Sequence, residues 1–233
     1  MASLELATRD SSLTTMAAAH LPFNLGYNSG NDAVRHRPPV PFSRSFAMPN
    51  TSRTSLISGG HRGAEAEFGR CAKRWGIDQT TLSFEGHAME WPVGVKVLGE
   101  AELAEGDISM AIVSKRMGRT YHEADLIRRV IQSLYHMVNG SWQVFAIGWI
   151  QPDDTVKGGT GWGVELAKMF NREIWVFDQG RHQWFTWTDG RWNPAEPKIG
   201  SRAFSGTGTR NLSDEGREAI QSLFERSFGP AKH

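Results

Sequence analysis

The sequence predicts an α/β fold, a three-layer sandwich with a mostly parallel β-sheet. Three observations predict it. Short apolar runs alternate with amphipathic stretches from residue 55 onward, some of these runs are continuously apolar, and two glycine clusters each follow an apolar run. Continuous apolar runs are typical of strands that are covered on both faces. Strands that alternate with helices are typical of a parallel sheet.

The first elements follow from local spacing. Residues 55–58 form a short apolar strand that ends at a glycine pair, and residues 64–75 repeat apolar side chains at helical spacing. Gly76 is placed to end that helix. Residues 80–84 and 108–113 are predicted as the second and third strands, the third followed by a polar turn at 114–116.

The middle of the chain has the clearest helical periodicity. Residues 125–138 place Leu126, Val130 and Leu134 on one face, and Asn139-Gly140 follows as a stop signal. Residues 143–150 are almost continuously apolar, which predicts a buried strand. A helix over 164–170 and a buried strand over 174–177 complete the alternating pattern.

The C-terminal part predicts an aromatic β-hairpin and a helix. Four aromatic residues in the segment 184–192 surround Asp189-Gly190, which is a typical type I′ turn sequence. The hairpin could cover a ligand or an edge of the sheet. The segment 205–210 is either a connector or a third phosphate contact. It precedes a helix expected from about Asp214 to Phe228 with Ser213 as its cap.

The chain is expected to comprise a tail, residues 1–54, and a domain, residues 55–233. The tail is rich in Ser, Thr, Asn and Pro and has no apolar periodicity, so disorder is predicted. Its five arginines and lack of lysine would suit an organelle-targeting peptide, but Glu5 and Asp10 do not. A cytoplasmic location is therefore expected.

Composition excludes several classes of function. The net charge of +1, from 26 basic and 25 acidic residues, argues against a large nucleic-acid interface. A single cysteine, Cys71, excludes a disulfide framework and paired-cysteine zinc sites, and it is expected to be buried rather than nucleophilic. The apolar runs are too short to cross a membrane. The scattered histidines give little support for a catalytic metal, and no cofactor is predicted.

Two glycine clusters carry the functional signal. The first is Ser58-Gly59-Gly60-His61-Arg62-Gly63-Ala64-Glu65, and the second is Lys157-Gly158-Gly159-Thr160-Gly161-Trp162-Gly163-Val164-Glu165. Each lies between a predicted strand and a predicted helix. Such a loop lets the backbone approach a ligand, and the N-terminus of the helix favours an anion. The first cluster could also be a tight turn whose glycines serve packing alone.

The second cluster resembles the Gly-Gly-x-Gly-Thr-x-x-Glu signature of the lysine-decarboxylase-like (LOG) proteins. The first resembles the Ser-Gly-Gly-x-x-Gly-x-Asp stretch of other members of the SLOG superfamily. The resemblance covers about residues 55–180 and implies a Rossmann-like domain that binds a nucleotide or a nucleotide-derived ligand. The LOG branch hydrolyses the N-glycosidic bond of nucleoside 5′-monophosphates, whereas other branches only sense or carry ligands.

The resemblance implies roles for particular residues. Glu165 would be the catalytic carboxylate, with Arg116 and Arg119 near the position of the catalytic arginine motif, which is absent as such. The same acid could instead only stabilise the first turns of its helix. Ligand-binding residues are expected to be Ser58, Gly59, Gly60, Arg62, Gly63, Glu65, Lys115, Gly158, Gly159, Thr160, Gly161 and Trp162.

Two hypotheses follow for function. The first is a nucleotide-binding protein that hydrolyses an N-glycosidic bond. The second is a non-catalytic sensor or carrier module for a nucleotide-derived ligand, which is favoured because Lys157 and Trp162 replace the family's proline and threonine. In both cases the expected partner is a small molecule. The LOG resemblance further implies a homodimer.

Overall fold

The computed structural model describes residues 54–121 and 124–231. The prediction of a disordered tail over 1–54 therefore concerns residues that lie outside this part, apart from residue 54.

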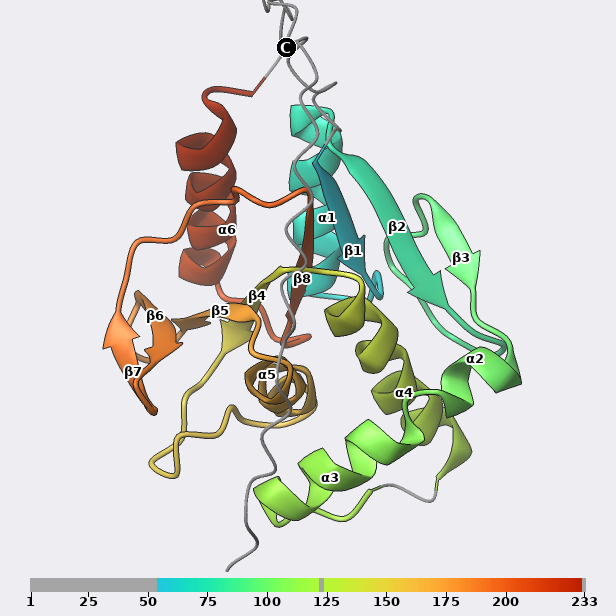
Figure 1. Ribbon diagram of the computed structural model, residues 1–233. Helices are drawn as coiled ribbons and strands as arrows, with labels where there is room; N and C mark the ends of the chain where they lie inside the picture. The colour runs from blue at the N-terminus through green and yellow to red at the C-terminus, as the bar shows by residue number, and fades with distance from the viewer. Residues whose placement is uncertain (1–53, 122–123, 232–233) are drawn as a thin grey trace, which may run out of the picture. The chain divides into compact units, whose positions relative to one another are not determined.

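The described part of the chain is an α/β sandwich built on an eight-stranded sheet in the order β3-β2-β1-β8-β4-β5-β6-β7 (Figure 1). Neighbouring strands from β3 to β5 are parallel, and β6 and β7 continue the sheet as antiparallel strands. The strands are β1 (Ser55–Ser58), β2 (Asp78–Ser83), β3 (Val95–Val97), β4 (Gln143–Gly148), β5 (Glu173–Asp178), β6 (Gln183–Thr188), β7 (Arg191–Pro194) and β8 (Ala203–Gly208).

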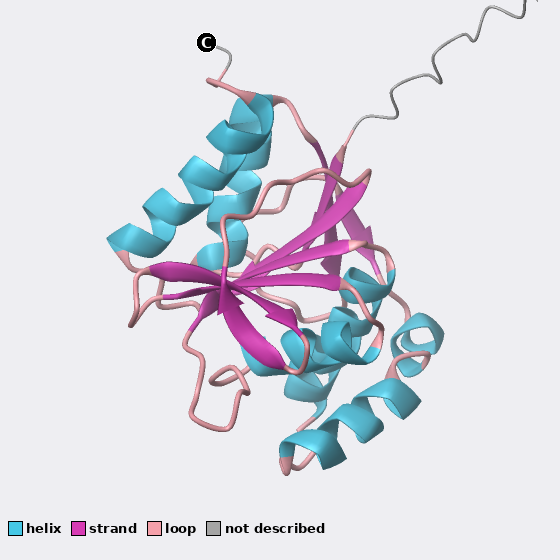
Figure 2. Ribbon diagram, turned by 60° about the vertical axis from the view of Figure 1, so that its left-hand side comes forward, coloured by secondary structure: helices cyan, strands magenta, loops and turns pink. Residues whose placement is uncertain are grey.

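Helices cover both faces of this sheet. Helices α1 and α6 pack together on one face, and α3, α4 and α5 lie on the other (Figure 2). The helices are α1 (Ala64–Trp75), α2 (Glu100–Ala104), α3 (Asp107–Met117), α4 (Asp125–Asn139), α5 (Thr160–Met169) and α6 (Asp214–Phe228). Within residues 54–121 and 124–231, no helix has the length and apolar character needed to span a membrane.

Strand β4 contributes side chains to the hydrophobic cores on both faces of the sheet. Every residue of this strand is buried. Val144 and Ala146 belong to the core beneath α3, α4 and α5, whereas Phe145 and Ile147 belong to the core beneath α1 and α6. Because alternate side chains of a strand point to opposite faces, a continuous apolar run supplies both cores.

Local signals for turns and helix ends are confirmed. Gly76 ends α1 in the left-handed conformation, with φ of 68°. The Ser213 hydroxyl caps α6 by accepting a hydrogen bond from the Gly216 N–H at 3.1 Å. Asp189 and Gly190 both have positive φ, 54° and 72°, as a type I′ hairpin requires.

The prediction of a strand over 108–113 is wrong, because this segment forms most of α3. Met110 and Val113 are buried, which is the spacing of a helix, whereas Ile108 is 78% exposed and Ile112 is 43% exposed. A short apolar run fits a strand and a helix equally well, and only the side that is buried distinguishes them. Lys115 and Arg116 consequently lie in the last turn of α3 rather than in a loop after a strand.

The segment 205–210 is mostly strand rather than connector. Ser205 to Gly208 belong to β8, which lies between β1 and β4 in the middle of the sheet. The hydroxyl of Ser205 donates to the carbonyl of Met137 at 2.8 Å, so this polar residue is satisfied in the core. Gly206 faces Phe68 of α1, where a Cβ would lie 2.4 Å from the ring.

This contact makes Gly206 a position where small size is required. We expect Gly206→Ala to lower the free energy of unfolding by about 1–3 kcal/mol, because the added methyl group would displace the buried Phe68 ring. Urea unfolding of the purified protein measures this change. Gly200→Ala is the matched control, since no atom lies within 4 Å of its Cβ position. Equal stability of the two variants would contradict this account of β8 packing.

Candidate functional site

The two glycine clusters follow strands that end at the same, carboxyl edge of the sheet. The first cluster follows β1, the second follows β4, and Thr209-Arg210 follows β8, which lies between them. Since adjacent strands are about 4.8 Å apart, β1 and β4 are separated by about 10 Å, and residues 149–156 come between β4 and the second loop. The chain moves outward from β1 to β2 on one side and from β4 to β5 on the other. Ligands of open α/β sheets bind at such a reversal of strand order.

The glycines of the first cluster are explained by contacts within the chain. Gly60 has φ of 68°, and a Cβ there would lie 2.6 Å from the carbonyl oxygen of Trp91. Gly63 has φ of 92°, and its Cβ would lie 2.5 Å from the carbonyl oxygen of Thr209. Of the two alternatives for this cluster, a tight turn with close packing accounts for these two glycines.

Glu65 lies beneath this loop with its carboxylate fully engaged. Oε2 accepts hydrogen bonds from the backbone N–H of His61 at 3.1 Å and from His61 Nδ1 at 3.0 Å, and Oε1 accepts one from the Thr207 hydroxyl at 2.9 Å. Burial alone would raise the pKa of Glu65, but the bonds and charge of His61 and the bond from Thr207 outweigh it and lower the pKa. Glu65 is therefore a buried carboxylate that connects the β1 loop to β8.

His61 in turn contacts a second histidine, His87, which follows β2. The two Nε2 atoms are 2.9 Å apart, and His87 Nδ1 lies 3.3 Å from the Ser83 hydroxyl. Burial lowers the pKa of His61, yet Glu65 raises it by more. Burial and the neighbouring charge of His61 lower the pKa of His87 to about 4. At neutral pH, any positive charge of the pair therefore resides on His61.

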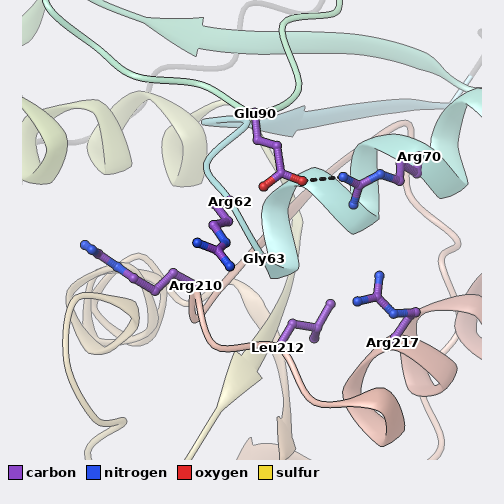
Figure 3. Close-up of a pocket in the computed structure, with 7 residues that line it drawn as sticks. All are labelled: Arg62, Gly63, Arg70, Glu90, Arg210, Leu212 and Arg217. Carbon is purple, nitrogen blue, oxygen red and sulfur yellow. Dashed lines mark hydrogen bonds and ion pairs between the residues drawn. The ribbon is translucent and has the colours of Figure 1, made fainter.

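A cavity of about 240 Å³ lies beside the start of α1. It is lined by Arg62, Gly63, Arg70, Glu90, Arg210, Leu212 and Arg217. Figure 3 shows the guanidinium groups of Arg62, Arg70 and Arg217 around this space, with Glu90 above and Leu212 below. The side chain of Arg210 extends away from Arg70 and Arg217. It lies near enough to His61 for its charge to lower the histidine's pKa.

The cavity has an excess of positive charge. Arg217 pairs with Glu67 at 2.7 Å, and Arg70 pairs with Glu67 at 3.2 Å and with Glu90. Four arginines against these two carboxylates leave a net charge of +2. Arg62 and Arg210 have no ion-pair partner among the described residues. The guanidinium groups of Arg62 and Arg210, residues that lie after the adjacent strands β1 and β8, are thus available to bind an anion.

The second glycine cluster leaves room above its backbone. No atom lies within 4 Å of a Cβ built on Gly158 or Gly159, and the two residues are exposed at the start of α5. By contrast, a Cβ on Gly161 would lie 2.1 Å from the carbonyl oxygen of Val156, so this glycine is required by packing. Thr160 and Trp162 are buried at 7% and 4% exposure.

The predicted catalytic residues have other neighbours. Glu165 Oε1 accepts a hydrogen bond from Lys168 Nζ at 2.7 Å, and this ammonium lies 3.7 Å from the ring centroid of Trp187 in the hairpin. Arg119 donates to the carbonyl oxygens of Gly158 at 3.0 Å and Val156 at 3.3 Å. Arg119 is thus brought to the second glycine loop, where it holds the backbone. Its catalytic role and that of Glu165 stay predictions.

Some of the other predicted ligand-binding and catalytic residues lie at the carboxyl edge of the sheet, and others are exposed on α3. Ser58, Gly59, Gly60, Arg62, Gly63 and Glu65 all lie at the end of β1 or the start of α1. Lys115 and Arg116 are exposed on α3. Cys71 is buried, and burial raises the pKa of its thiol to about 12. No group of three or more His, Cys, Asp and Glu side chains within the described ranges is arranged to hold a metal ion.

Sequence reasoning did not assign roles to His61, His87 or Arg217. His61 lies inside the first glycine cluster, four residues before Glu65, and this spacing was the available signal for their pairing. His87 comes from a loop 26 residues away, and Arg217 from a helix 150 residues beyond Glu67. Only the tertiary structure brings these side chains together.

Comparison with known proteins leaves the family open. No protein-family model matches the chain, and no curated protein matches it. A similar solved structure is that of a proposed molybdenum carrier protein from Syntrophus aciditrophicus SB. It is 15% identical, with a TM-score of 0.45 over 75% of this chain and 94% of that chain. Because a likeness at this level does not establish a family, the LOG and SLOG resemblance rests on the sequence motifs.

The Glu65–His61 pair predicts a bell-shaped pH dependence of stability. The lowered pKa of Glu65 stabilises the fold above its ordinary value of 4.5, and this contribution is lost as the pH falls through the lowered pKa. The raised pKa of His61 stabilises the fold below 6.5, and this contribution is lost as the pH rises through the raised pKa. Both contributions are complete only between these two values.

We therefore expect Glu65→Gln to destabilise the protein most between pH 4.5 and 6.5. Loss of the charged hydrogen bonds should lower the free energy of unfolding there by about 1.5–3 kcal/mol. Urea unfolding at pH 4, 5.5 and 8.5 measures the difference between the variant and the original chain. A difference that is constant over this range would show that the pair is not ionised as described.

Proposed function

We propose that the protein binds a phosphate-bearing small molecule, of the nucleoside monophosphate class, at the carboxyl edge of its sheet. The observation that carries this proposal is the pair Arg62 and Arg210. These guanidinium groups follow the adjacent strands β1 and β8 and have no ion-pair partner among the described residues. Guanidinium is the side-chain group best suited to bidentate contacts with phosphate.

The surroundings of Arg62 support a phosphate rather than a carboxylate ligand. Arg70 and Arg217, which pair with Glu67 and Glu90, also line the cavity, and the start of α1 lies at its wall. A helix N-terminus favours an anion, and a dianion gains more than a single charge from a cavity of net charge +2. The cavity volume of about 240 Å³ accommodates a phosphate together with part of a sugar.

The nucleoside part of the ligand is inferred from the loops. The motifs of both glycine clusters resemble those of the SLOG superfamily, whose members bind nucleotides or nucleotide-derived ligands. The two clusters follow β1 and β4, which lie on either side of β8, and the space above Gly158 and Gly159 is open. In the proposed binding mode, the phosphate lies at the first loop and the nucleoside extends toward the second.

The resemblance also supports a finer proposal, hydrolysis of the N-glycosidic bond of that nucleotide with Glu165 as the carboxylate. The ion pair of Glu165 with Lys168 instead supports a role in holding the β6–β7 hairpin against α5. A non-catalytic sensor or carrier is the alternative, in which the same arginines hold the ligand without turnover.

We expect Arg62→Gln and Arg210→Gln each to weaken binding of AMP by about 10- to 100-fold, because each removes charged hydrogen bonds to the phosphate. Isothermal titration calorimetry with AMP, GMP, CMP and UMP measures the dissociation constants. Arg191→Gln is the matched control, since Arg191 is exposed in the distant hairpin strand β7. The binding proposal fails if no nucleotide of the panel binds, or if all three variants bind alike.

A further inference from the structure

We propose that Glu65 and His61 form an acid–base centre that acts on the ligand held by Arg62 and Arg210. His61 is the catalytic residue, because it exchanges a proton with the ligand, and Glu65 is the positioning residue behind it. This inference rests on the proposed nucleotide binding. It replaces the sequence-based assignment of the carboxylate role to Glu165 with a pair of residues whose contacts suit proton transfer.

The geometry of the pair sets the roles of the two ring nitrogens. Glu65 Oε2 lies 3.0 Å from His61 Nδ1 and also accepts the backbone N–H of the same residue at 3.1 Å. A carboxylate in this position keeps the proton on Nδ1 and fixes the plane of the ring. Nε2, which lies 2.9 Å from Nε2 of the neutral His87, is then the nitrogen that takes up or releases a proton.

The accessibility of the two side chains supports this division. The side chain of Glu65 is 6% exposed, and its second oxygen is occupied by the Thr207 hydroxyl. The side chain of His61 is 34% exposed, so a ligand can approach the ring. The buried acid therefore cannot contact a substrate directly, whereas the histidine can.

The position of the pair connects it to the proposed ligand site. The next residue after His61 is Arg62, which lines the cavity, and Arg210 is close enough to influence the histidine electrostatically. The Glu65 carboxylate accepts a hydrogen bond from Thr207 of β8, and this strand lies between the two strands that the glycine loops follow. In the proposed binding mode, a nucleotide whose phosphate contacts Arg62 extends past His61 toward the second loop.

Of His61 and the polar groups around it, His61 is the group suited to donate a proton at neutral pH. His87 lies 2.9 Å away and follows β2, where burial keeps its ring neutral, and its second nitrogen lies 3.3 Å from the Ser83 hydroxyl. Arg210 does not release a proton at neutral pH. Glu65 and Thr207 are hydrogen-bonded to one another beneath the ring.

The reaction that this arrangement suits is hydrolysis of an N-glycosidic bond. In this step the departing base nitrogen takes the place of His87 as the partner of His61 Nε2. Protonated His61 donates its Nε2 proton to that nitrogen as the bond between the nitrogen and the sugar C1′ breaks. Water adds to C1′ and returns a proton to His61. One water is consumed, and the products are the free base and ribose 5-phosphate. The negative charge of Glu65 stabilises the imidazolium before and after the step.

The experiment uses the full chain with AMP, GMP, CMP and UMP, and chromatography of the free base. We expect His61→Gln to lower base release by about 10²- to 10⁴-fold, while AMP affinity changes less than the loss of Arg62 would change it. Glu65→Gln should lower base release by a smaller factor and shift the pH profile of turnover to lower pH. His182→Asn is the matched control, because His182 is exposed in the β5–β6 turn with φ of 53°, which Asn tolerates.

A measurement without ligand keeps the proposal testable if His61→Gln does not fold. Histidine ¹⁵N NMR of the original chain should show that His61 carries its neutral-form proton on Nδ1, and Glu65→Gln should lower the pKa of His61. A merely structural role would leave the pH profile of turnover unchanged. An unchanged pKa of His61 in Glu65→Gln would overturn the proposal.

The outcomes separate this inference from the proposed function. Absence of nucleotide binding would remove the proposed function itself. Binding without base release would leave that function intact and overturn the acid–base role. Base release that is lost in Glu165→Gln but retained in His61→Gln would also overturn it and return the carboxylate role to α5.

Discussion

The carboxylate of Glu65, on α1, joins this helix to the β1 loop and to strand β8 at the carboxyl edge of the sheet. It accepts hydrogen bonds from the backbone and the ring of His61 in the β1 loop, and from Thr207 on β8. A buried carboxylate is costly unless it is hydrogen-bonded on both oxygens, and here both are occupied. The conformation of the loop, the orientation of the His61 ring and the approach of β8 therefore depend on one side chain.

Glu67, two residues further along α1, has the corresponding role on the opposite side of the helix start. Its carboxylate is 2% exposed and binds Arg217 of α6 and Arg70 of α1. Residues two apart on a helix point to different sides, so one helical turn places Glu65 against His61 and Thr207 and Glu67 beside the arginine cavity. Because Glu67 and Glu90 neutralise Arg70 and Arg217, the uncompensated charge of the cavity belongs to Arg62 and Arg210.

Much of the fold could be predicted from local patterns, and the exceptions share a cause. The helix over 64–75 has a single amphipathic face and a glycine stop, and both are local. By contrast, 108–113 is apolar on the exposed side as well as the buried side, so its period is hidden. Ser205 to Gly208, the second part of the central strand β8, has no large apolar residue, because Phe68 of α1 fills the space over Gly206. The sequence of 108–113 does not reveal which of its faces is exposed, and the sequence of 205–208 does not reveal that Phe68 packs against it.

The candidate site shows the same limit for function. The glycine motif correctly indicates where the backbone turns at the end of β1, but the glycines there fit against Trp91 and Thr209 rather than against open space. Space for a ligand is left instead by the arginine cavity and by Gly158 and Gly159 of the second loop. A glycine-rich strand-to-helix turn can thus border a ligand site, as Arg62 and Gly63 do here, while Gly60 and Gly63 also serve packing within the chain. The chemistry of this edge is carried by charged side chains from the loops that follow β1 and β8 and from helices α1 and α6.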